Sequence, residues 1–235
     1  MWRTLALPSP LRVVPHRSHE RSAEEATALL AACKARTDGH APLCTSEKLP
    51  ADVTALIATY STPEPPPAQR GRGRPRHTPR RVLEATLLYA QGEKRREQGR
   101  VVEVHRRILC GARDISTKVL GGQQIHTAYV ERDNLTSRRS IGRLVHQTLS
   151  HAKKSSFLGC HLALEDAVFN FVRPHQALRI AVPHPTLGCT WQQRTPAMAV
   201  ELTDHLWSLE ELLSYRVPPP KDSNQFHGSE GQHHA

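Results

Sequence analysis

The sequence is poor in three features, and each of these restricts its function before any motif is considered. Aromatic residues make up only 5% of the 235 residues, and none line up as a platform on which the bases of single-stranded RNA would stack. No apolar run approaches the ~18 residues that a membrane-spanning helix needs. The five cysteines are scattered and never two residues apart, which argues against a disulfide framework and a zinc knuckle. A basic RNA-binding accessory protein is therefore a weaker hypothesis than a DNA-binding one.

What the sequence does contain is positive charge. Its 32 lysines and arginines exceed its 22 aspartates and glutamates, for a formal net charge of +10. Such an excess predicts a polyanionic partner, nucleic acid first and an anionic membrane surface second. Pro8, Pro10 and Arg12 interrupt any signal-like apolar core at the start of the chain. We therefore expect a cytoplasmic protein without a membrane partner.

The first 61 residues show the pattern of an α/β protein. Weak alternation predicts strands over 3–7 and 11–16, with a turn at Pro8–Pro10. A capping box at Ser22–Glu25 begins a helix that stops near residue 38. A short buried strand follows over 43–46, with Glu47 at its exit, and Pro50 opens a second helix.

Residues 62–82 form a linker rich in proline and arginine. Ten lysines and arginines but only three glutamates fall within 70–100, so this region favours phosphate contacts of any sequence. Within it, Arg72-Gly73-Arg74-Pro75-Arg76 resembles the core of an AT-hook, which lies in the narrow minor groove of A·T tracts. The alternative interpretation is a solvated basic linker with no groove preference.

The rest of the chain reads as a basic hairpin followed by helices. Residues 85–96 and 101–110 predict two strands that turn at Gln98-Gly99. Apolar stripes predict helices over 129–154 and 157–172, and Thr195-Pro196 and Ser208 predict two short helices near the end. The predicted organisation has five parts: an N-terminal α/β part (1–61), the linker (62–82), the hairpin with the Glu131-bearing helix (83–180), a C-terminal helical segment (181–216) and a disordered tail (217–235).

Glu131 and Arg138 are seven residues apart, so they share a face if this segment is helical. A carboxylate beside a cation on a DNA-facing helix suits metal-assisted phosphodiester chemistry, in which the acid holds a metal and the base holds a phosphate. From spacing alone, an ordinary solvent-exposed charged helix is the simpler interpretation.

Several separated motifs favour the metal-assisted interpretation over an ordinary exposed helix: Ile125–Lys154, Asn170-Phe171-Val172-Arg173-Pro174-His175, Arg95–Val104, Arg194–Ala199 and Thr203–Leu213. Taken in the order in which they occur along the chain, they resemble bacterial insertion-sequence transposases of the DDE type, most of all the insertion-sequence-one group, over most of residues 40–222. The resemblance implies an RNase H-like catalytic domain that uses Mg²⁺ for DNA cleavage and strand transfer. It makes Glu131 the last acid of the catalytic triad and Glu47 the second, both as metal ligands. It also implies DNA contacts by a set of basic residues: Arg132, Arg138, Arg139, Arg143, Lys153, Lys154, Arg173 and His175.

Two departures from the family pattern bear on activity. The family has an aspartate after Thr-Ser where this chain has Glu47, one methylene longer, and two metal ions about 3.5–4 Å apart tolerate little displacement of their ligands. No acidic residue occurs before Glu20, so the strand that carries the first aspartate of the family is expected to be missing.

We therefore expect an incomplete RNase H-like α/β fold, with a mixed sheet flanked by helices, a C-terminal helical extension and a disordered tail. The predicted function is that of a truncated transposase that no longer performs strand transfer. Its partners would be insertion-sequence ends and target DNA, with a homo-oligomer as one option. The alternative is a non-catalytic DNA-binding protein that uses Arg72, Arg74, Arg76 and the basic helix, and whose binding is indifferent to Glu131→Ala.

Overall fold

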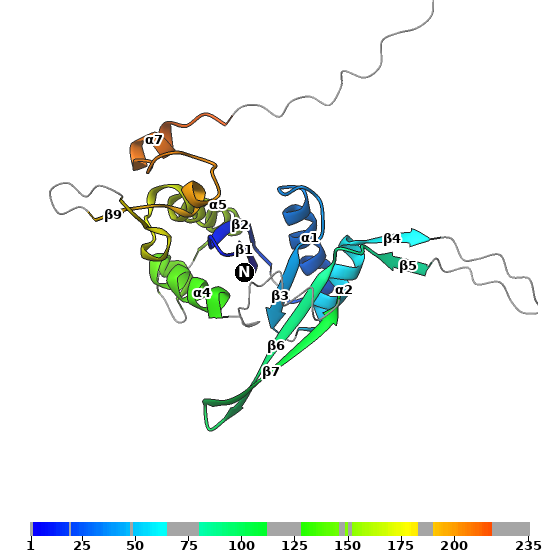
Figure 1. Cartoon of the computed structure of the whole chain (residues 1–235). Coiled ribbons are helices and arrows are strands. Elements are labelled where there is room, and N and C mark those ends of the chain that lie inside the picture. Colours follow the sequence, from blue (N-terminus) through cyan, green and yellow to red (C-terminus); the bar gives the residue numbers. More distant parts are fainter. Residues whose placement is uncertain are drawn as a thin grey trace, which may run out of the picture.

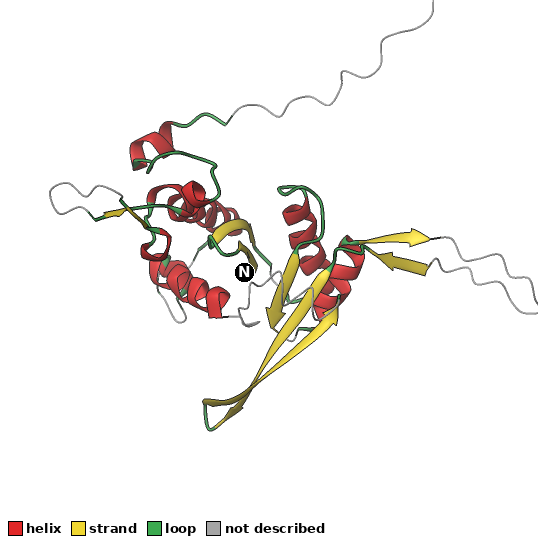
Figure 2. Cartoon of the chain, viewed as in Figure 1, coloured by secondary structure: helices red, strands yellow, loops and turns green. Residues whose placement is uncertain are grey.

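The computed structural model describes residues 2–18, 20–47, 49–64, 80–111, 128–145, 149, 152–182 and 190–217. They form a mixed α/β structure in which the strands belong to small sheets (Figure 1, Figure 2). The strands are β1 (Trp2–Ala6), β2 (Leu11–His16), β3 (Leu43–Glu47), β4 (Ser61–Glu64), β5 (Arg80–Leu83), β6 (Leu88–Glu97), β7 (Arg100–Cys110), β8 (Ile180–Ala181) and β9 (Trp191–Gln192). The α-helices are α1 (Ala23–Lys34), α2 (Pro50–Thr59), α4 (Ala128–Ser140), α5 (Ser155–Ala167), α6 (Pro196–Ala199) and α7 (Leu209–Ser214). Shorter helical turns are η1 (Gly142–Leu144), η2 (Val168–Val172) and η3 (Gln176–Leu178).

The N-terminal elements confirm the local predictions. Strands β1 and β2 pair antiparallel, with Trp2 opposite His16. Ser22 caps α1, because its hydroxyl accepts a hydrogen bond from the backbone N–H of Glu25 at 3.3 Å. Pro50 occupies the first turn of α2, where its missing N–H costs nothing.

A three-stranded mixed sheet, in the order β3-β6-β7, carries the main apolar core. β3 runs parallel to β6, with Leu43 opposite Leu88 and Glu47 opposite Gly92, and β6 turns back into the antiparallel β7. One face of this sheet packs against α1 and α2 through a buried cluster: Ala41, Leu56, Tyr60, Leu87 and Tyr89. β3, β6 and β7 therefore form a mixed sheet flanked by helices, as the sequence predicted.

The ends of the predicted linker do not run as an extended arm. Ser61–Glu64 and Arg80–Leu83 pair antiparallel as β4 and β5, although their residues stay largely exposed. The AT-hook-like residues Arg72, Arg74 and Arg76 lie outside the described residues, as does the tail after Val217.

The helix predicted over 129–154 is shorter than expected. It ends at Ser140, and Ile141 takes an extended conformation (φ −114°, ψ 98°) that places its side chain in the interior with no exposed surface. Gly142, a poor helix former, follows directly. The continuous apolar stripe was therefore a wrong prediction, and Leu149, one of its members, is 99% exposed. The next predicted helix, 157–172, exists as α5 and continues into the π-helical turn η2.

The β1–β2 hairpin lies between two groups of helices (Figure 1). It contacts α1 on one side and α4 and α5 on the other. This position matters because α4 is the helix that carries Glu131 and the predicted DNA-contacting arginines.

Candidate nucleic-acid interface

Glu131 lies in the first turn of α4 and reaches the three-stranded sheet. Its Oε1 forms an ion pair with Nζ of Lys94, which lies on β6 and is partly buried. The carboxylate predicted to hold a metal is therefore held by an ammonium group from the hairpin. Because this contact joins α4 to β6, it brings together two segments that the sequence had predicted separately.

Glu47 is the last residue of β3 and is exposed. It stands opposite Gly92 in the parallel pair, and Lys94 follows two residues later on β6. Side chains two residues apart on a strand point to the same face, so Glu47 and Lys94 lie on one face of the sheet. The two predicted metal ligands therefore approach the same end of the sheet, with Lys94 as the group in contact with Glu131.

This arrangement does not fit a Mg²⁺ site as it stands. Mg²⁺ is held by oxygen ligands in near-octahedral geometry, whereas Glu131 is paired with a cation. In the part of the chain that the structure describes, no three histidine, cysteine, aspartate or glutamate side chains are grouped so that they could hold a metal ion. The magnesium cofactor stays a prediction.

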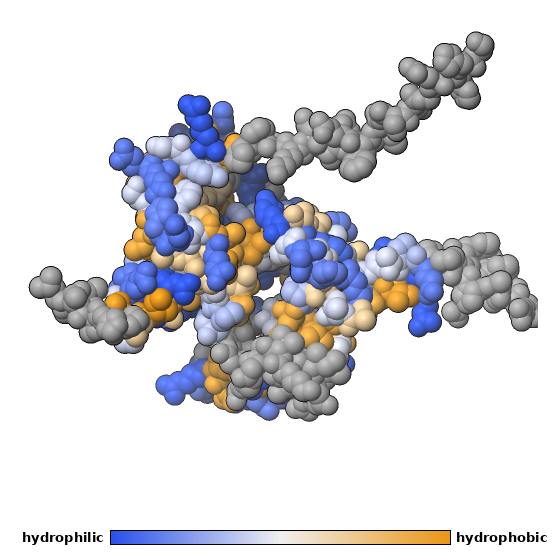
Figure 3. Space-filling model, turned by 45° about the horizontal axis from the view of Figure 1, so that its top comes forward, coloured by the Kyte–Doolittle hydropathy of each residue, from blue (hydrophilic) through white to orange (hydrophobic). Residues whose placement is uncertain are grey.

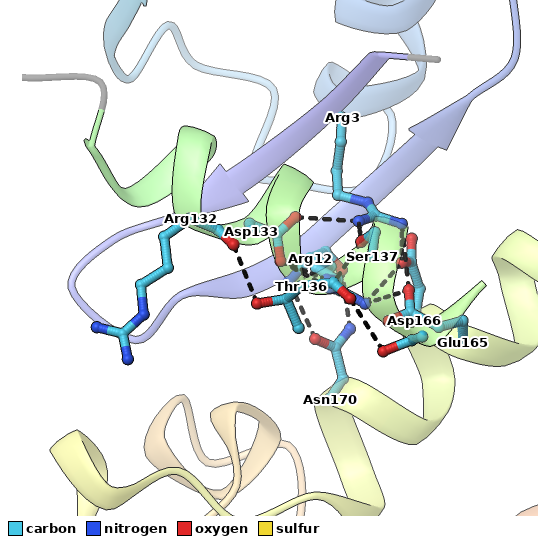
Figure 4. A network of polar contacts seen from close by, with 10 residues as sticks. Arg3, Arg12, Arg132, Asp133, Thr136, Ser137, Glu165, Asp166 and Asn170 are labelled. Carbon is cyan, nitrogen blue, oxygen red and sulfur yellow. Dashed lines mark hydrogen bonds and ion pairs between the residues drawn. The ribbon is translucent and has the colours of Figure 1, made fainter. Parts of the chain in front are cut away.

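The predicted DNA-contacting residues lie almost entirely on the surface. Exposed members are Arg132, Arg138, Arg139, Arg143, Lys153, Lys154 and Arg173. Arg132 points away from the interior of the protein (Figure 4). On the face seen in Figure 3, hydrophilic residues lie beside hydrophobic ones, and several large apolar side chains of the helical part are exposed.

His175 differs from the other predicted contacts. Its ring packs edge-on against Phe169, with centroids 4.4 Å apart, and its Nε2 is buried without a hydrogen-bond partner. Burial, reinforced by Arg173, lowers the pKa of His175. A neutral imidazole turned inward adds no positive charge to the surface.

A buried charge cluster, which the sequence did not reveal, fixes the orientation of α4. It consists of Arg3, Arg12, Asp133, Glu165 and Asp166 (Figure 4). The side chains of Arg3 and Arg12 are only 1% and 0% exposed. Arg3 contacts Asp133 at 3.0 Å and Asp166 at 2.6 Å, while Arg12 contacts Asp133 at 2.7 Å and also pairs with Glu165. Two cations on the hairpin thus bind three carboxylates on α4 and α5.

Neighbouring groups complete the environment of the cluster. The guanidinium of Arg12 lies 3.6 Å from the centroid of the Phe169 ring, and Ser137 receives hydrogen bonds from both arginines. Asn170 accepts a hydrogen bond from the backbone N–H of Arg12 at 3.0 Å and donates one to its carbonyl at 2.8 Å. Arg12 is therefore held by its side chain and its backbone at once.

The charges of the cluster do not balance when every acid is ionised. Burial raises the pKa of Asp166 to about 7; Arg3 and Arg12 oppose the rise, while Glu165 and Asp133 add to it. The Oδ2 atom of Asp166 is buried and has no hydrogen-bond partner among the described residues. A proton on Asp166 would bring the cluster to two cations and two anions.

The cluster decides which face of α4 meets the solvent. Asp133 and Ser137, four residues apart, form the buried face that meets the two arginines. The opposite face exposes Arg132, Leu135 and Arg139. A sequence clue existed in the spacing of Asp133 and Ser137, but polar residues at helical spacing usually mark a solvated face.

Comparison with known proteins adds no family: no family model, curated protein or solved structure matches this chain. Within the described ranges, no helix combines the length and apolar character required to cross a membrane.

Proposed function

We propose that this protein binds duplex DNA through an exposed basic surface, and that it is a transposase-like chain that does not perform strand transfer. The surface comprises residues 95–107 of the β6–β7 hairpin, here called the basic arm, together with the outer face of α4. The observation that carries the proposal is the basic arm. Five of its thirteen residues are arginines and two are glutamates, and all but Val104 are exposed.

Electrostatics explains why this surface suits DNA. Each lysine or arginine that neutralises a phosphate releases a condensed counterion, so binding strengthens as salt falls. On α4, Arg132 and Arg139 are seven residues apart and exposed, and the buried charge cluster holds their helix in one orientation. Fixed cations lose less conformational freedom on binding than cations on a mobile segment.

The state of Glu131 supports the absence of strand transfer. Two-metal catalysis needs free carboxylates that bridge or flank the ions, but the Glu131 carboxylate is paired with Lys94. Glu47 is also one methylene longer than the aspartate of the transposase family. The resemblance to DDE-type transposases supplies the DNA partner, and insertion-sequence ends remain the predicted substrate class.

DNA binding is tested by fluorescence anisotropy of the full chain with a labelled duplex at several salt concentrations. We expect affinity to fall steeply with salt, and the triple substitution Arg132→Ala, Arg138→Ala and Arg139→Ala to weaken binding and lower the salt slope by about one per lost phosphate contact. Arg36→Ala is the control, because Arg36 is exposed and precedes the start of β3, whereas Glu47 is the last residue of β3 and the basic arm extends beyond that end of the sheet. Equal binding by the triple variant and the control would refute the assignment to α4.

Catalysis is tested on the same preparation with Mg²⁺ or Mn²⁺ and duplexes that carry candidate terminal repeats. We expect no specific nicking and unchanged DNA affinity in Glu131→Ala. Specific nicking that disappears in Glu131→Ala would overturn the assignment of this chain as non-catalytic.

A further inference from the structure

The β6–β7 hairpin extends beyond the sheet to which it belongs. β3 pairs with β6 only as far as Gly92, whereas β6 continues to Glu97 and β7 begins at Arg100. Residues 93–97 and 100–105 therefore form a two-stranded ribbon that no third described strand accompanies. In Figure 1 the tip of this ribbon lies clear of the other labelled elements.

The tip of the ribbon has a defined shape although it is surrounded by solvent. Gln98 and Gly99 both have positive φ angles, 48° and 80°, which is the pattern of a two-residue type I′ turn. The register shifts by one residue between Arg95 and Arg96. Arg95 pairs with Glu103 and Arg96 pairs with Val101, so that Val102 is the extra residue of a bulge. Such a bulge strengthens the local twist of a ribbon, and residues 95–103 are all exposed.

The register sorts the charges of the ribbon by face. On β6, Lys94 and Arg96 point to one face of the ribbon and Arg95 points to the other. The cross-strand partner of Lys94 is Val104, that of Arg96 is Val101, and Gly92 stands opposite Arg106. The charged ribbon residues on this face are Lys94, whose charge is paired with Glu131 at the base of the ribbon, and Arg96, which is exposed nearer the tip. The opposite face mixes signs, and there Arg95 contacts Glu97 at 2.6 Å and Glu103 at 3.8 Å.

The width and length of the ribbon match the major groove of B-form DNA. Paired strands lie about 4.8 Å apart, and the major groove of B-form DNA, roughly 12 Å wide, admits a two-stranded ribbon. The minor groove of undistorted B-form DNA is only roughly 6 Å wide, so a ribbon that entered it would have to bend and open the duplex, at a cost in free energy. In A-form RNA the major groove is too deep and narrow for side chains to read. Five residues at about 3.3 Å each give a reach of roughly 17 Å, which exceeds the ~8.5 Å depth of the DNA major groove.

We propose that the free end of the β6–β7 ribbon enters the major groove of B-form DNA, with the cationic face that carries Arg96 toward the bases. This inference rests on the proposed DNA binding and adds the groove, the helical form of the nucleic acid and the residue at the contact. Arg96 is suited to this contact because its guanidinium can donate two parallel hydrogen bonds to O6 and N7 of guanine. It is exposed and lies two residues before the first residue of the turn, Gln98.

The test is anisotropy of the full chain with four forms of one sequence: plain duplex DNA, the same duplex with glucosylated 5-hydroxymethylcytosine filling the major groove, the plain duplex with netropsin in its A·T minor groove, and duplex RNA. We expect glucosylation to weaken binding by about tenfold or more, the loss of one bidentate base contact, whereas netropsin leaves it unchanged. Duplex RNA should bind more weakly than plain DNA. Binding that netropsin abolishes and glucosylation does not affect would overturn the inference and assign recognition to the minor groove. Equal binding of DNA and RNA would also overturn it, and binding to none of the four would overturn DNA binding itself.

A matched pair of variants assigns the effect to the ribbon. Arg96→Ala should bind the plain duplex about tenfold more weakly and lose most of its sensitivity to glucosylation. Arg36→Ala, the exposed control, should keep both the affinity and the sensitivity. Thermal unfolding of Arg96→Ala should match that of the wild type, because the side chain is exposed. Undiminished sensitivity to glucosylation in Arg96→Ala would show that another element enters the groove.

Discussion

The buried charge cluster predicts that the protein loses stability as the pH rises from about 4 to about 7. Burial raises the pKa of Asp166 from 3.8 to about 7 in the folded state. Between these two values the folded protein binds a proton that the unfolded chain does not, so the free energy of unfolding falls with rising pH. A shift of about three pKa units corresponds to roughly 4 kcal/mol. Burial of Asp166 therefore lowers the free energy of unfolding by the full amount above pH 7 and by almost nothing below pH 4.

The measurement is urea unfolding of the wild type and Asp166→Asn between pH 5 and pH 8. An amide is neutral at every pH and has nearly the shape of the protonated acid. We expect the variant to be more stable than the wild type by roughly 1.6 kcal/mol at pH 5, which is 1.2 pH units above the unfolded pKa of 3.8, and by roughly 4 kcal/mol at pH 8. Taking the difference between the two proteins removes the contribution of the titratable groups that they share.

The control is Asp38→Asn, at an exposed acid whose Oδ1 accepts a hydrogen bond from the backbone N–H of His40 at 3.1 Å. An asparagine can accept the same bond, so this substitution controls for the exchange of a carboxylate for an amide at an exposed position. The opposite result would be that Asp166→Asn is less stable than the wild type and that this deficit is larger at pH 8 than at pH 5. Asp166 would then be ionised in the folded protein. The assignment of the proton to Asp166 would then be wrong.

Three further substitutions test other parts of the structure. Arg12→Met should lower the free energy of unfolding at pH 7 by about 3–5 kcal/mol, because it leaves the three carboxylates of the buried cluster with Arg3 as their one remaining cation there; a urea midpoint equal to that of Arg36→Ala would contradict this. Gly99→Ala should cost about 1 kcal/mol in the hairpin, since its φ of 80° is strained for any side chain even though nothing lies within 4 Å of the added Cβ. Amide hydrogen exchange in β6 and β7 measures this loss, and unchanged protection there would argue against the turn. Ser22→Ala should destabilise by about 1 kcal/mol and Ser22→Gly by only a few tenths; thermal unfolding should rank them in that order if the α1 cap is as described.

Local chemistry explains which parts of the fold could be predicted from the sequence. The cap of α1 depends on Ser22 and Glu25, three residues apart, and the β6–β7 turn depends on Gln98 and Gly99 alone. Both patterns lie within a few residues and act through backbone hydrogen bonds or φ angles. The end of α4 at Ser140 was missed, because the burial of Ile141 is set by tertiary packing and not by its neighbours in sequence.

The site was predictable only in part for the same reason. The exposed arginines of α4 follow from helical spacing once Asp133 and Ser137 are known to face inward. That knowledge depends on Arg3 and Arg12, which are more than 120 residues away in the chain. The pairing of Glu131 with Lys94 is also a long-range contact, across 37 positions. A resemblance to transposases pointed to Glu131, but it could not reveal which cation Glu131 would meet.

The two hydrogen bonds between Asn170 and the backbone of Arg12 have a consequence for self-association. A carboxamide that donates to a carbonyl and accepts from an N–H reproduces the pairing that a neighbouring strand would offer. At Arg12, Asn170 therefore occupies the open edge of β2, the kind of edge along which separate molecules join into aggregates. One side chain on η2 thus keeps the two-stranded β1–β2 unit from recruiting a strand of a second molecule at this point.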